Sequence, residues 1–338
     1  MSTDLVLPNL AVGARVQDPL LVLDVEQRGG DNPHTLLTFG NRSGRIQSAP
    51  FWSSDQPKVA GISRGDIVQV IGDVGAYRDK RQLKVTSIRV LPRATANWRD
   101  LMPSVGEVGP YWKKLDEWRA EVRGPRLRNT LALFYDDPEF RRRYQECPAS
   151  PSGHHSELGG LLQHTTEVAA IARTIGRVAG ADPDLVLAGA LLHDIGKLDA
   201  YSWQGFFDTT TVGRLLGHVV LGCLMLDRRV GEEENPPCTD QELEILHHLI
   251  LSHHGQLEFG SPVMPMTLEA EVLHYADNAS AKTASMADAL ENAENFTGEE
   301  LFSKSLWQLE KRRAFRGKSD WGKHSASDEG RGETKAEA

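Results

Sequence analysis

The chain has 338 residues, of which 40% are hydrophobic and 25% charged, as in a globular protein with a sizeable core. Its net charge of −9 argues against binding nucleic acid through bulk charge alone, and no apolar run approaches the roughly 20 residues of a membrane helix. The first residues show no basic region followed by an apolar block, and the three cysteines form neither a CxxC pair nor a disulfide framework. We therefore expect a cytoplasmic protein of two or three domains.

The first part of the chain, to about residue 95, has the pattern of a small β-barrel. Five short segments rich in β-branched residues alternate with glycines and polar turns; they are PLLVLDVEQ, HTLLTFGN, GRIQSAPFW, DIVQVIGDVGAY and RQLKVTSIRVL. Five such strands, with a short helix near residues 57–60, are typical of an OB-type barrel, although other five-stranded barrels would share the pattern. Between Met1 and Thr95 there are 12 basic and 9 acidic side chains. This mild excess is either a weak sign of a polyanionic partner or a chance fluctuation.

Beyond the barrel the chain is expected to be helical. Three prolines and two glycines at 92–110 indicate a linker, and the helical segments YWKKLDEWRAEV, RLRNTLALFY and DPEFRRRYQE follow it. The predicted fold class is therefore multidomain α and β: an OB-fold barrel at 1–95, a linker with connecting helices at 96–150, and an all-α bundle at 151–316. The polar tail at 317–338 is expected to be disordered.

Each of five predicted helices carries a histidine or an aspartate on its apolar face. In the first, His164 lies on the stripe of Leu161, Val168, Ile171, Ile175 and Val178. The second begins at Asp182-Pro183, presents Asp194 on the face of Leu187 and Ala190, and can end at Gly196 in a left-handed cap. Adjacent residues on a helix point about 100° apart, so that His193 and Asp194 can approach one centre only from its rim or end.

The other three helices repeat the arrangement. In GRLLGHVVLGCLML, His218 is in register with Leu215 and Gly222. The fourth helix opens with a capping box at Thr239, runs through Leu246 and Ile250 to His253 and His254, and stops at Gly255. The fifth places Asp277 on the face of Ala270, Leu273 and Ala281.

A single histidine on an apolar face is more often a hydrogen-bonded core residue than a metal ligand, and His247, His248 and His274 are interpreted in that way. Considered together, seven polar groups would need partners in one core without an evident Ser, Asn or Tyr network; they are His164, His193, Asp194, His218, His253, His254 and Asp277. One or two divalent metal ions would satisfy all of them. Imidazole with carboxylate suits Mn, Fe, Co, Ni or Zn, and a pair of ions would need a bridging carboxylate, for which Asp194 is the candidate.

The same residues carry a family resemblance. His164, the His193-Asp194 pair within HDIGK, and Asp277 resemble, in chain order, the ligands of the HD-domain metal-dependent phosphohydrolase superfamily. His218 and the His253-His254 pair look like its variants that hold two metals. The resemblance implies a phosphoester hydrolase with an all-helical core and two divalent ions. Manganese is favoured, with cobalt, iron, nickel or magnesium as alternatives.

Longer stretches narrow the resemblance. HHSELGGLLQHT (154–165), GHVVLG (217–222) and LSHHGQLEFGSPVMPMTLEAEVLHYADNASAK (251–282), behind an OB-like domain, look like the YhaM-type 3′→5′ exoribonuclease family. The resemblance covers roughly residues 12–316 and is most specific between 154 and 282. The chain departs from the family pattern at three positions: it has Pro151 where the family has a lysine, Gln163 where the family has an acidic residue, and Ser280 where the family has a second aspartate.

Further residues are candidates for catalysis and for holding the substrate. Lys197, one turn from Asp194, is a candidate catalytic residue that neutralises charge on the phosphate, or else a solvated lysine at a helix C-terminus. The resemblance implies that His154, His155 and Lys282 contact the end of the substrate; without it they would be loop histidines and a surface charge.

In the barrel, Phe39, Phe51, Trp52 and Tyr77 are candidates for stacking on bases, although most aromatic side chains of a small barrel belong to its core. Basic candidates for phosphate contacts are Arg42, Arg45, Arg78, Lys80 and Arg81, and the loop at 78–81 is the best of them. The stretch GNRSG also has the pattern of a plain hairpin turn.

The predicted function is therefore a metal-dependent 3′→5′ exoribonuclease that degrades single-stranded RNA to nucleoside monophosphates. Whether DNA is also a substrate, and whether the chain forms a homo-oligomer, stays open, and no membrane partner is expected. Two alternatives remain. The first is an HD phosphohydrolase of small nucleotides, which would ignore end-labelled oligomers. The second is a nucleic-acid-binding adaptor with a structural HD core, against which the intact set of ligands speaks.

Overall fold

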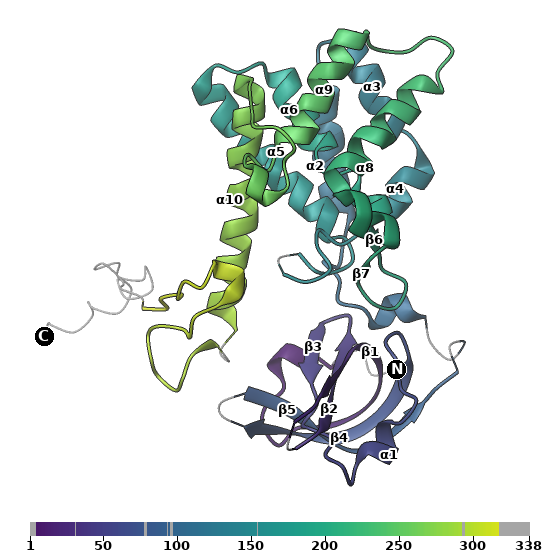
Figure 1. Cartoon of the computed structure of the whole chain (residues 1–338), viewed down its shortest axis with the longest axis vertical. Helices are drawn as coiled ribbons and strands as arrows, with labels where there is room; N and C mark the ends of the chain where they lie inside the picture. The colour runs from purple at the N-terminus through teal and green to yellow at the C-terminus, as the bar shows by residue number, and fades with distance from the viewer. Residues whose placement is uncertain are drawn as a thin grey trace, which may run out of the picture.

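The structure is a computed structural model that describes residues 5–30, 32–77, 80–92, 94, 97–153, 155–292 and 295–317. It has two parts, an N-terminal β-barrel and a larger group of helices, which lie at opposite ends of the molecule in Figure 1. Of the tail expected at 317–338, residues 318–338 lie outside the described residues.

The N-terminal part is a five-stranded antiparallel sheet with the strand order β3-β2-β1-β4-β5. Its strands are β1 (Arg15–Arg28), β2 (His34–Asn41), β3 (Gly44–Gln47), β4 (Ile67–Tyr77) and β5 (Lys80–Val90), and the short helix α1 (Gln56–Val59) follows β3. A parallel bridge between Ser48 and Leu83 joins the ends of the order, so that the sheet closes on itself. The antiparallel sheet followed by helices confirms the predicted OB-type fold class.

The barrel core is filled by the inward-facing residues of these strands. Phe39 and Phe51 are both buried in it, so the prediction that they could stack on bases is wrong. Their burial follows from the alternation of the strands, because one side of each strand of a small barrel must fill the interior. Trp52, with 46% of its surface exposed, and Tyr77 lie on the outside.

The helical part begins after the 3-10 turn η3 (Trp98–Leu101). Its helices are α2 (Gly109–Ala120), α3 (Pro125–Tyr135), α4 (Pro138–Tyr144), α5 (Gly160–Ala179), α6 (Pro183–Leu192), α7 (Lys197–Ala200), α8 (Thr211–Gly231), α9 (Asp240–Ser252) and α10 (Leu268–Glu291). One continuous apolar core holds α2 to α10 together. The long helix α10 packs along α5 and extends down towards the barrel (Figure 1). None of the described helices is both long and apolar enough to cross a membrane.

The two parts are packed against each other rather than joined by a free linker. Leu21, Leu23 and Ile67 of the barrel belong to the same apolar core as the helices. Arg64 reaches the short hairpin of β6 (Tyr201–Ser202) and β7 (Asp208–Thr209), where its guanidinium donates to the carbonyl of Phe207 at 2.9 Å. This hairpin lies between the barrel and the bundle in Figure 1.

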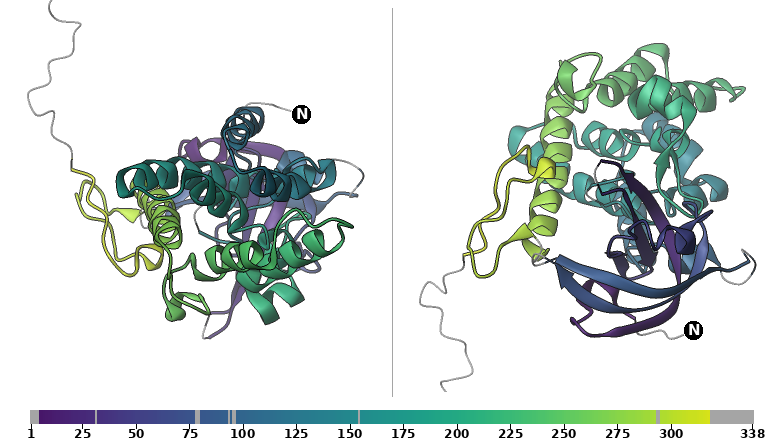
Figure 2. Two further views of the ribbon diagram at one scale, coloured as in Figure 1. Left: turned by 90° about the horizontal axis from the view of Figure 1, so that it is seen from above. Right: turned by 60° about the horizontal axis from the view of Figure 1, so that its bottom comes forward.

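The residues after α10 form a small irregular segment that packs on the C-terminal end of this helix. Phe296, Leu306, Leu309 and Ala314 make a separate apolar cluster with Ala289 of α10. Figure 2 shows this segment lying beside α10.

Three local predictions for the helices are wrong. Val178 is 84% exposed in the last turn of α5, which ends at Gly180 in a left-handed cap. Gly196 is not a left-handed cap: its φ is −66°, and a Cβ there would lie 2.0 Å from the carbonyl oxygen of His218. Glycine is needed at that position for close packing against α8.

The third error concerns α8. Gly217 has φ 74° and ψ 155°, which kinks the helix one residue before His218. Leu215 is therefore not on the inward face with His218, and 77% of its surface is exposed. The kink is what directs the side chain of His218 towards the ends of α6 and α9.

Candidate metal centre

All seven side chains singled out by their helical positions meet in one place. His164 comes from α5 and Asp277 from α10, which pack side by side. His193 and Asp194 follow the last residue of α6, while His253 and His254 follow the last residue of α9. His218 comes from α8 just after its kink.

The first group of ligands consists of His164, His193 and Asp277, whose ligand atoms all lie within 4.8 Å of one another. Nε2 of His164 is 3.0 Å from Oδ1 of Asp277 and 3.4 Å from Nε2 of His193. Both histidines are buried. The three atoms therefore converge on one point inside the bundle.

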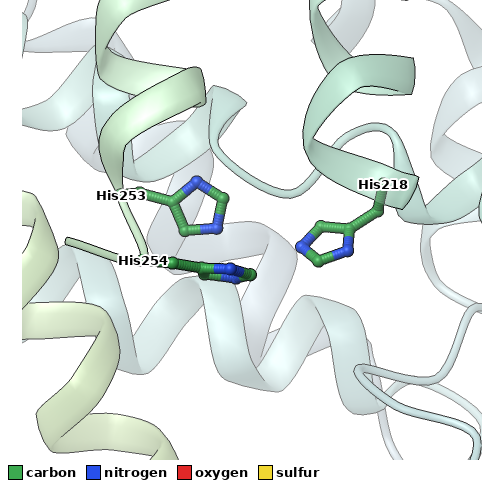
Figure 3. A group of neighbouring side chains, drawn as sticks. All are labelled: His218, His253 and His254. Atoms are coloured by element: carbon green, nitrogen blue, oxygen red, sulfur yellow. The ribbon is translucent and has the colours of Figure 1, made fainter. Parts of the chain in front are cut away.

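The second group consists of His218, His253 and His254, again with ligand nitrogens within 4.8 Å of one another. Figure 3 shows the ring of His218 facing the rings of His253 and His254 from across the site. His218 lies far from His253 and His254 in the sequence. The kink in α8 and the end of α9 bring the three side chains together.

Asp194 lies between the two groups and turns one oxygen towards each. Its Oδ2 is 3.1 Å from Nε2 of His193 and 3.4 Å from that of His164. Its Oδ1 is 3.4 Å from Nε2 of His218 and 3.8 Å from that of His253. This is the arrangement of a carboxylate that bridges two cations.

The ends of α6 and α9 orient two of the histidines in the same way. Nδ1 of His193 donates to the carbonyl of Ala190 at 2.8 Å, and Nδ1 of His253 donates to that of Ile250 at 2.7 Å. Both acceptors are carbonyls of the last helical turn, which have no partner within the helix. With the proton on Nδ1, Nε2 carries the lone pair that faces the site. The negative ends of both helix dipoles also point there, which favours a cation.

Electrostatics separate the two groups of histidines. Burial lowers the pKa of His218 to about 3, and burial together with the neighbouring imidazoles also lowers the pKa of His253. These rings are therefore neutral at neutral pH, which is the form that binds metal. Burial opposes a charge on His164, but the neighbouring carboxylates of Asp194 and Asp277 raise its pKa to about 9.

The carboxylates are held in their ionised form. Burial alone would raise the pKa of Asp194, but His193, Lys197 and His164 around it hold this pKa well below its usual range. The pKa of Asp277 is likewise lowered, against its burial, by the hydrogen bond from His164. Two anions in a buried site favour positive charge between them.

The residues present fit a pair of divalent cations. Among the described residues, Oδ1 of Asp194 and Nε2 of His218 and His253 are buried without a hydrogen bond of acceptable geometry. Leaving three buried lone-pair atoms in this state is costly unless a ligand satisfies them. Imidazole nitrogen with carboxylate oxygen is a donor set for first-row transition metals such as Mn, Fe, Co, Ni and Zn.

A pocket of about 230 Å³ opens onto this centre. His164, Lys197, His254, Asp277 and Lys282 line it, together with Phe259, His274, Asn278 and Ala281. Sequence reasoning missed His274, which it assigned to the surface or packing. The signal available was its position one turn before Asp277 on α10; in the structure its Nδ1 lies 2.9 Å from the carbonyl of His253.

Lys197 is buried, with 7% of its surface exposed, and its Nζ lies 2.5 Å from Oδ2 of Asp194. The alternative that it is a solvated lysine at a helix C-terminus is wrong, because it is the first residue of α7 and faces the pocket. Burial opposes its charge, but Asp194 raises the pKa of Lys197 above its usual value. Lys282 is half exposed and forms an ion pair with Glu310.

Other predicted substrate contacts have mixed outcomes. His154 and Arg78 lie outside the described residues. His155 is described: its Nε2 lies 3.0 Å from Oε2 of Glu167, and its backbone is left-handed with φ 49°. It lines a second pocket, of about 560 Å³, between the bundle and the barrel, where Arg45 donates to the carbonyl of Ser156 at 3.0 Å.

Glycines explain the backbone around His155. A Cβ on Gly160 would lie 2.0 Å from the carbonyl oxygen of His155, and Gly159 has φ 85°. Both positions therefore require glycine, because the loop before α5 folds tightly onto its first turn. The Gly-Gly pair in the sequence is a structural requirement of this loop.

In the barrel, Lys80 and Trp52 are exposed, and Trp52 lies beside the ring of His34 at 4.7 Å between ring centres. Arg81 is partly buried and its guanidinium donates to the carbonyl of Leu10 at 3.3 Å. The first two side chains are therefore accessible to a ligand. The turn at Arg42-Ser43 is a two-residue hairpin between β2 and β3, as the stretch GNRSG indicated.

Known proteins similar to this chain share one description. The HD domain family matches residues 161–282, which contain all seven candidate ligands. The 3′-5′ exoribonuclease YhaM of Bacillus subtilis (strain 168) is 33% identical over 83% of this chain and 89% of its own length. The 3′-5′ exoribonuclease YhaM of Geobacillus sp. (strain WCH70) is 30% identical over 89% of this chain and 91% of its own length. That of Shouchella clausii (strain KSM-K16) is 32% identical over 89% and 93%. No solved structure matches the chain significantly.

Proposed function

Because the chain belongs to the 3′-5′ exoribonuclease YhaM family, we propose that it is a metal-dependent 3′→5′ exoribonuclease. It removes nucleoside monophosphates from the 3′ end of single-stranded RNA. The observation that carries the proposal is Asp194, whose two oxygens each face a separate group of buried histidines.

We assign the metal ligands in two sets. His164, His193 and Asp277 would hold one ion, His218, His253 and His254 would hold the other, and Asp194 would bridge them. When bound, a pair of divalent ions polarises the phosphodiester and activates the attacking water. Manganese is the proposed metal, because the mixed nitrogen and oxygen donors suit it better than magnesium.

The chain's own cations bind the substrate end beside this centre. Lys197 presents its ammonium to the pocket while it holds Asp194 ionised, and it offsets negative charge that builds on the reacting phosphate. Lys282, at the edge of the same pocket, is accessible enough to hold a phosphate. The pocket is too small for a duplex, which supports a single-stranded end as the substrate.

The barrel holds the rest of the strand. Trp52 and Tyr77 offer exposed aromatic faces for bases, and Lys80 offers a cation for the backbone. The proposed division is 1–95 for RNA binding, 96–150 for connection and 151–316 for hydrolysis. The three cysteines are free thiols, which supports a cytoplasmic location.

The test is the degradation of RNA labelled at its 5′ end by the manganese-loaded protein. We expect a ladder that shortens from the 3′ end, and no cleavage by Asp194→Asn. Asp199→Asn is the matched control, since Asp199 lies five residues further along and pairs with Arg143 instead. Hydrolysis of mononucleotides with intact oligomers would favour a small-nucleotide phosphohydrolase. Full activity of Asp194→Asn would refute the metal mechanism.

A further inference from the structure

A chain of hydrogen bonds leads from the metal centre to the second pocket, which Glu167 and His155 line. Nδ1 of His164 lies 3.1 Å from Oγ of Ser280, and this Oγ donates to Oε2 of Glu167 at 2.8 Å. The same oxygen of Glu167 lies 3.0 Å from Nε2 of His155. Gln163 donates to the other oxygen of Glu167 at 3.0 Å.

Direction can be assigned to each bond in this chain. Burial would raise the pKa of Glu167, but its contacts with His155, Gln163 and Ser280 lower it to about 2. Glu167 is therefore a carboxylate that can only accept hydrogen bonds. The hydroxyl of Ser280 gives its single proton to Glu167, so its oxygen must accept from His164. Nδ1 of His164 is thereby the nitrogen that donates to Ser280, and Nε2, which faces Asp277 and Asp194, is the nitrogen available to a cation.

His164 needs such help because of its place in its helix. His193 and His253 follow the ends of α6 and α9, where carbonyls of the last turn accept their Nδ1 protons. His164 is inside α5, where the backbone carbonyls of the preceding turn bond within the helix. A tertiary contact from α10 supplies the acceptor instead. Asp277 and Ser280, one turn apart on α10, hold the two nitrogens of the same ring.

We propose that Glu167, acting through Ser280, is a positioning residue that fixes the tautomer of the metal ligand His164. The inference rests on the proposed function, in that His164 must bind a metal ion. Neither Glu167 nor Ser280 is one of the proposed metal ligands, and neither lines the pocket that opens onto the metal centre. Their role is to keep Nε2 of His164 in the form and orientation that a cation needs.

Glu167→Gln tests the direction of the bonds with almost no change in shape. The amide of glutamine can donate to Ser280, which lets the serine hydroxyl turn and donate to His164. The imidazole then places its proton on Nε2, the wrong tautomer for the ion. We expect the affinity for Mn²⁺ to fall by roughly 10- to 100-fold, the usual loss when the outer partner of a metal-binding histidine is removed.

Metal affinity is measured by calorimetry with Mn²⁺ alone, and kcat and KM are measured at limiting and at saturating Mn²⁺. For Glu167→Gln and for Ser280→Ala we expect weaker binding of Mn²⁺, with kcat recovered in excess metal and an unchanged KM for RNA. Ser280→Thr keeps the hydroxyl and should restore affinity. Ser285→Ala is the control, because Ser285 is a buried serine of the same helix that donates only to the carbonyl of Ala281.

The double variant Glu167→Gln/Ser280→Ala should bind Mn²⁺ no more weakly than the single variant with the lower affinity, because both changes break the same chain of hydrogen bonds. Wild-type affinity in both single variants would overturn the inference. So would a loss that excess metal does not reverse, because general damage to the fold behaves in that way. His164→Ala separates a failure of this inference from a failure of the proposed metal centre. If this variant keeps the full metal affinity and stoichiometry, the assignment of the metal centre itself is wrong.

Discussion

The buried pair of Asp194 and Lys197 allows a prediction about stability that is separate from catalysis. The carboxylate and the ammonium are 2.5 Å apart, with 1% and 9% of their side-chain surfaces exposed. Asp194→Asn keeps the shape but leaves the ammonium of Lys197 buried without its counter-charge. Removing one partner of a buried ion pair costs about 3–5 kcal/mol of unfolding free energy. A domain typically has ~5–15 kcal/mol in total, so the variant should still fold.

The second change, Lys197→Met, should recover most of this loss. Replacement of both charges by neutral groups of similar volume is often neutral or stabilising, since neither desolvation cost remains. The double variant Asp194→Asn/Lys197→Met should therefore lie within about 1–2 kcal/mol of the wild type, well above Asp194→Asn alone. Neither variant should cleave RNA, because both lack the bridging carboxylate.

The assay is urea denaturation in the presence of EDTA, followed by circular dichroism of the helices, with Lys197→Met completing the cycle. Asp199→Asn again serves as the control for a carboxylate outside the centre. A double variant no more stable than Asp194→Asn would show that Lys197 is not held as a buried counter-charge. A stable Asp194→Asn with normal cleavage would also refute the reasoning.

Three further outcomes follow from the same geometry. EDTA should abolish cleavage, and Mn²⁺ should restore it. Metal titration should find two ions bound per chain in the wild type and about one in His218→Ala. One ion in the wild type would contradict the two sets of ligands. Lys282→Met should raise KM for RNA about tenfold, the effect of roughly 1.4 kcal/mol of lost phosphate binding, with little change in kcat. Trp52→Ala should weaken the binding of long oligomers, measured by fluorescence polarisation, by about 1–3 kcal/mol. Hydrolysis of dinucleotides should persist. Equal losses of activity on long oligomers and on dinucleotides would show that Trp52 does not contact the bound strand.

Local patterns in the sequence were sufficient for the barrel and for most of the helices. The alternation of the five strands is a short-range property, and each expected segment overlaps an observed strand, including the hairpin at Arg42-Ser43. The capping box at Thr239 and the aspartate cap at Asp182 start α9 and α6 where expected. These features depend on a few neighbouring residues, which the sequence contains in full.

Tertiary contacts account for the failures. The role of Gly196 could not be read from its neighbours, because the close approach of the His218 carbonyl comes from α8. The kink at Gly217, which sends Leu215 outward, interrupts an otherwise regular helical pattern. Phe39 and Phe51 differ from Trp52 only in the face of the barrel on which they lie, and register decides that face.

The candidate centre shows the same division between local and distant information. His193 and His253 each use a carbonyl three residues earlier, so a histidine directly after a helix end is oriented by its own segment. The pairs His193-Asp194 and His253-His254 were recognisable from the helical patterns that lead into them and from the family resemblance. His164 sits inside α5 and depends on Ser280, which is 116 residues away and was visible in the sequence only as a departure from the family pattern. Its contact with Glu167 gives that departure a physical meaning: a serine can serve where a carboxylate would, if a second residue supplies the charge behind it. A metal-binding histidine in the middle of a helix therefore needs a hydrogen-bond acceptor from another part of the fold. That acceptor is the part of the site that sequence patterns are least able to predict.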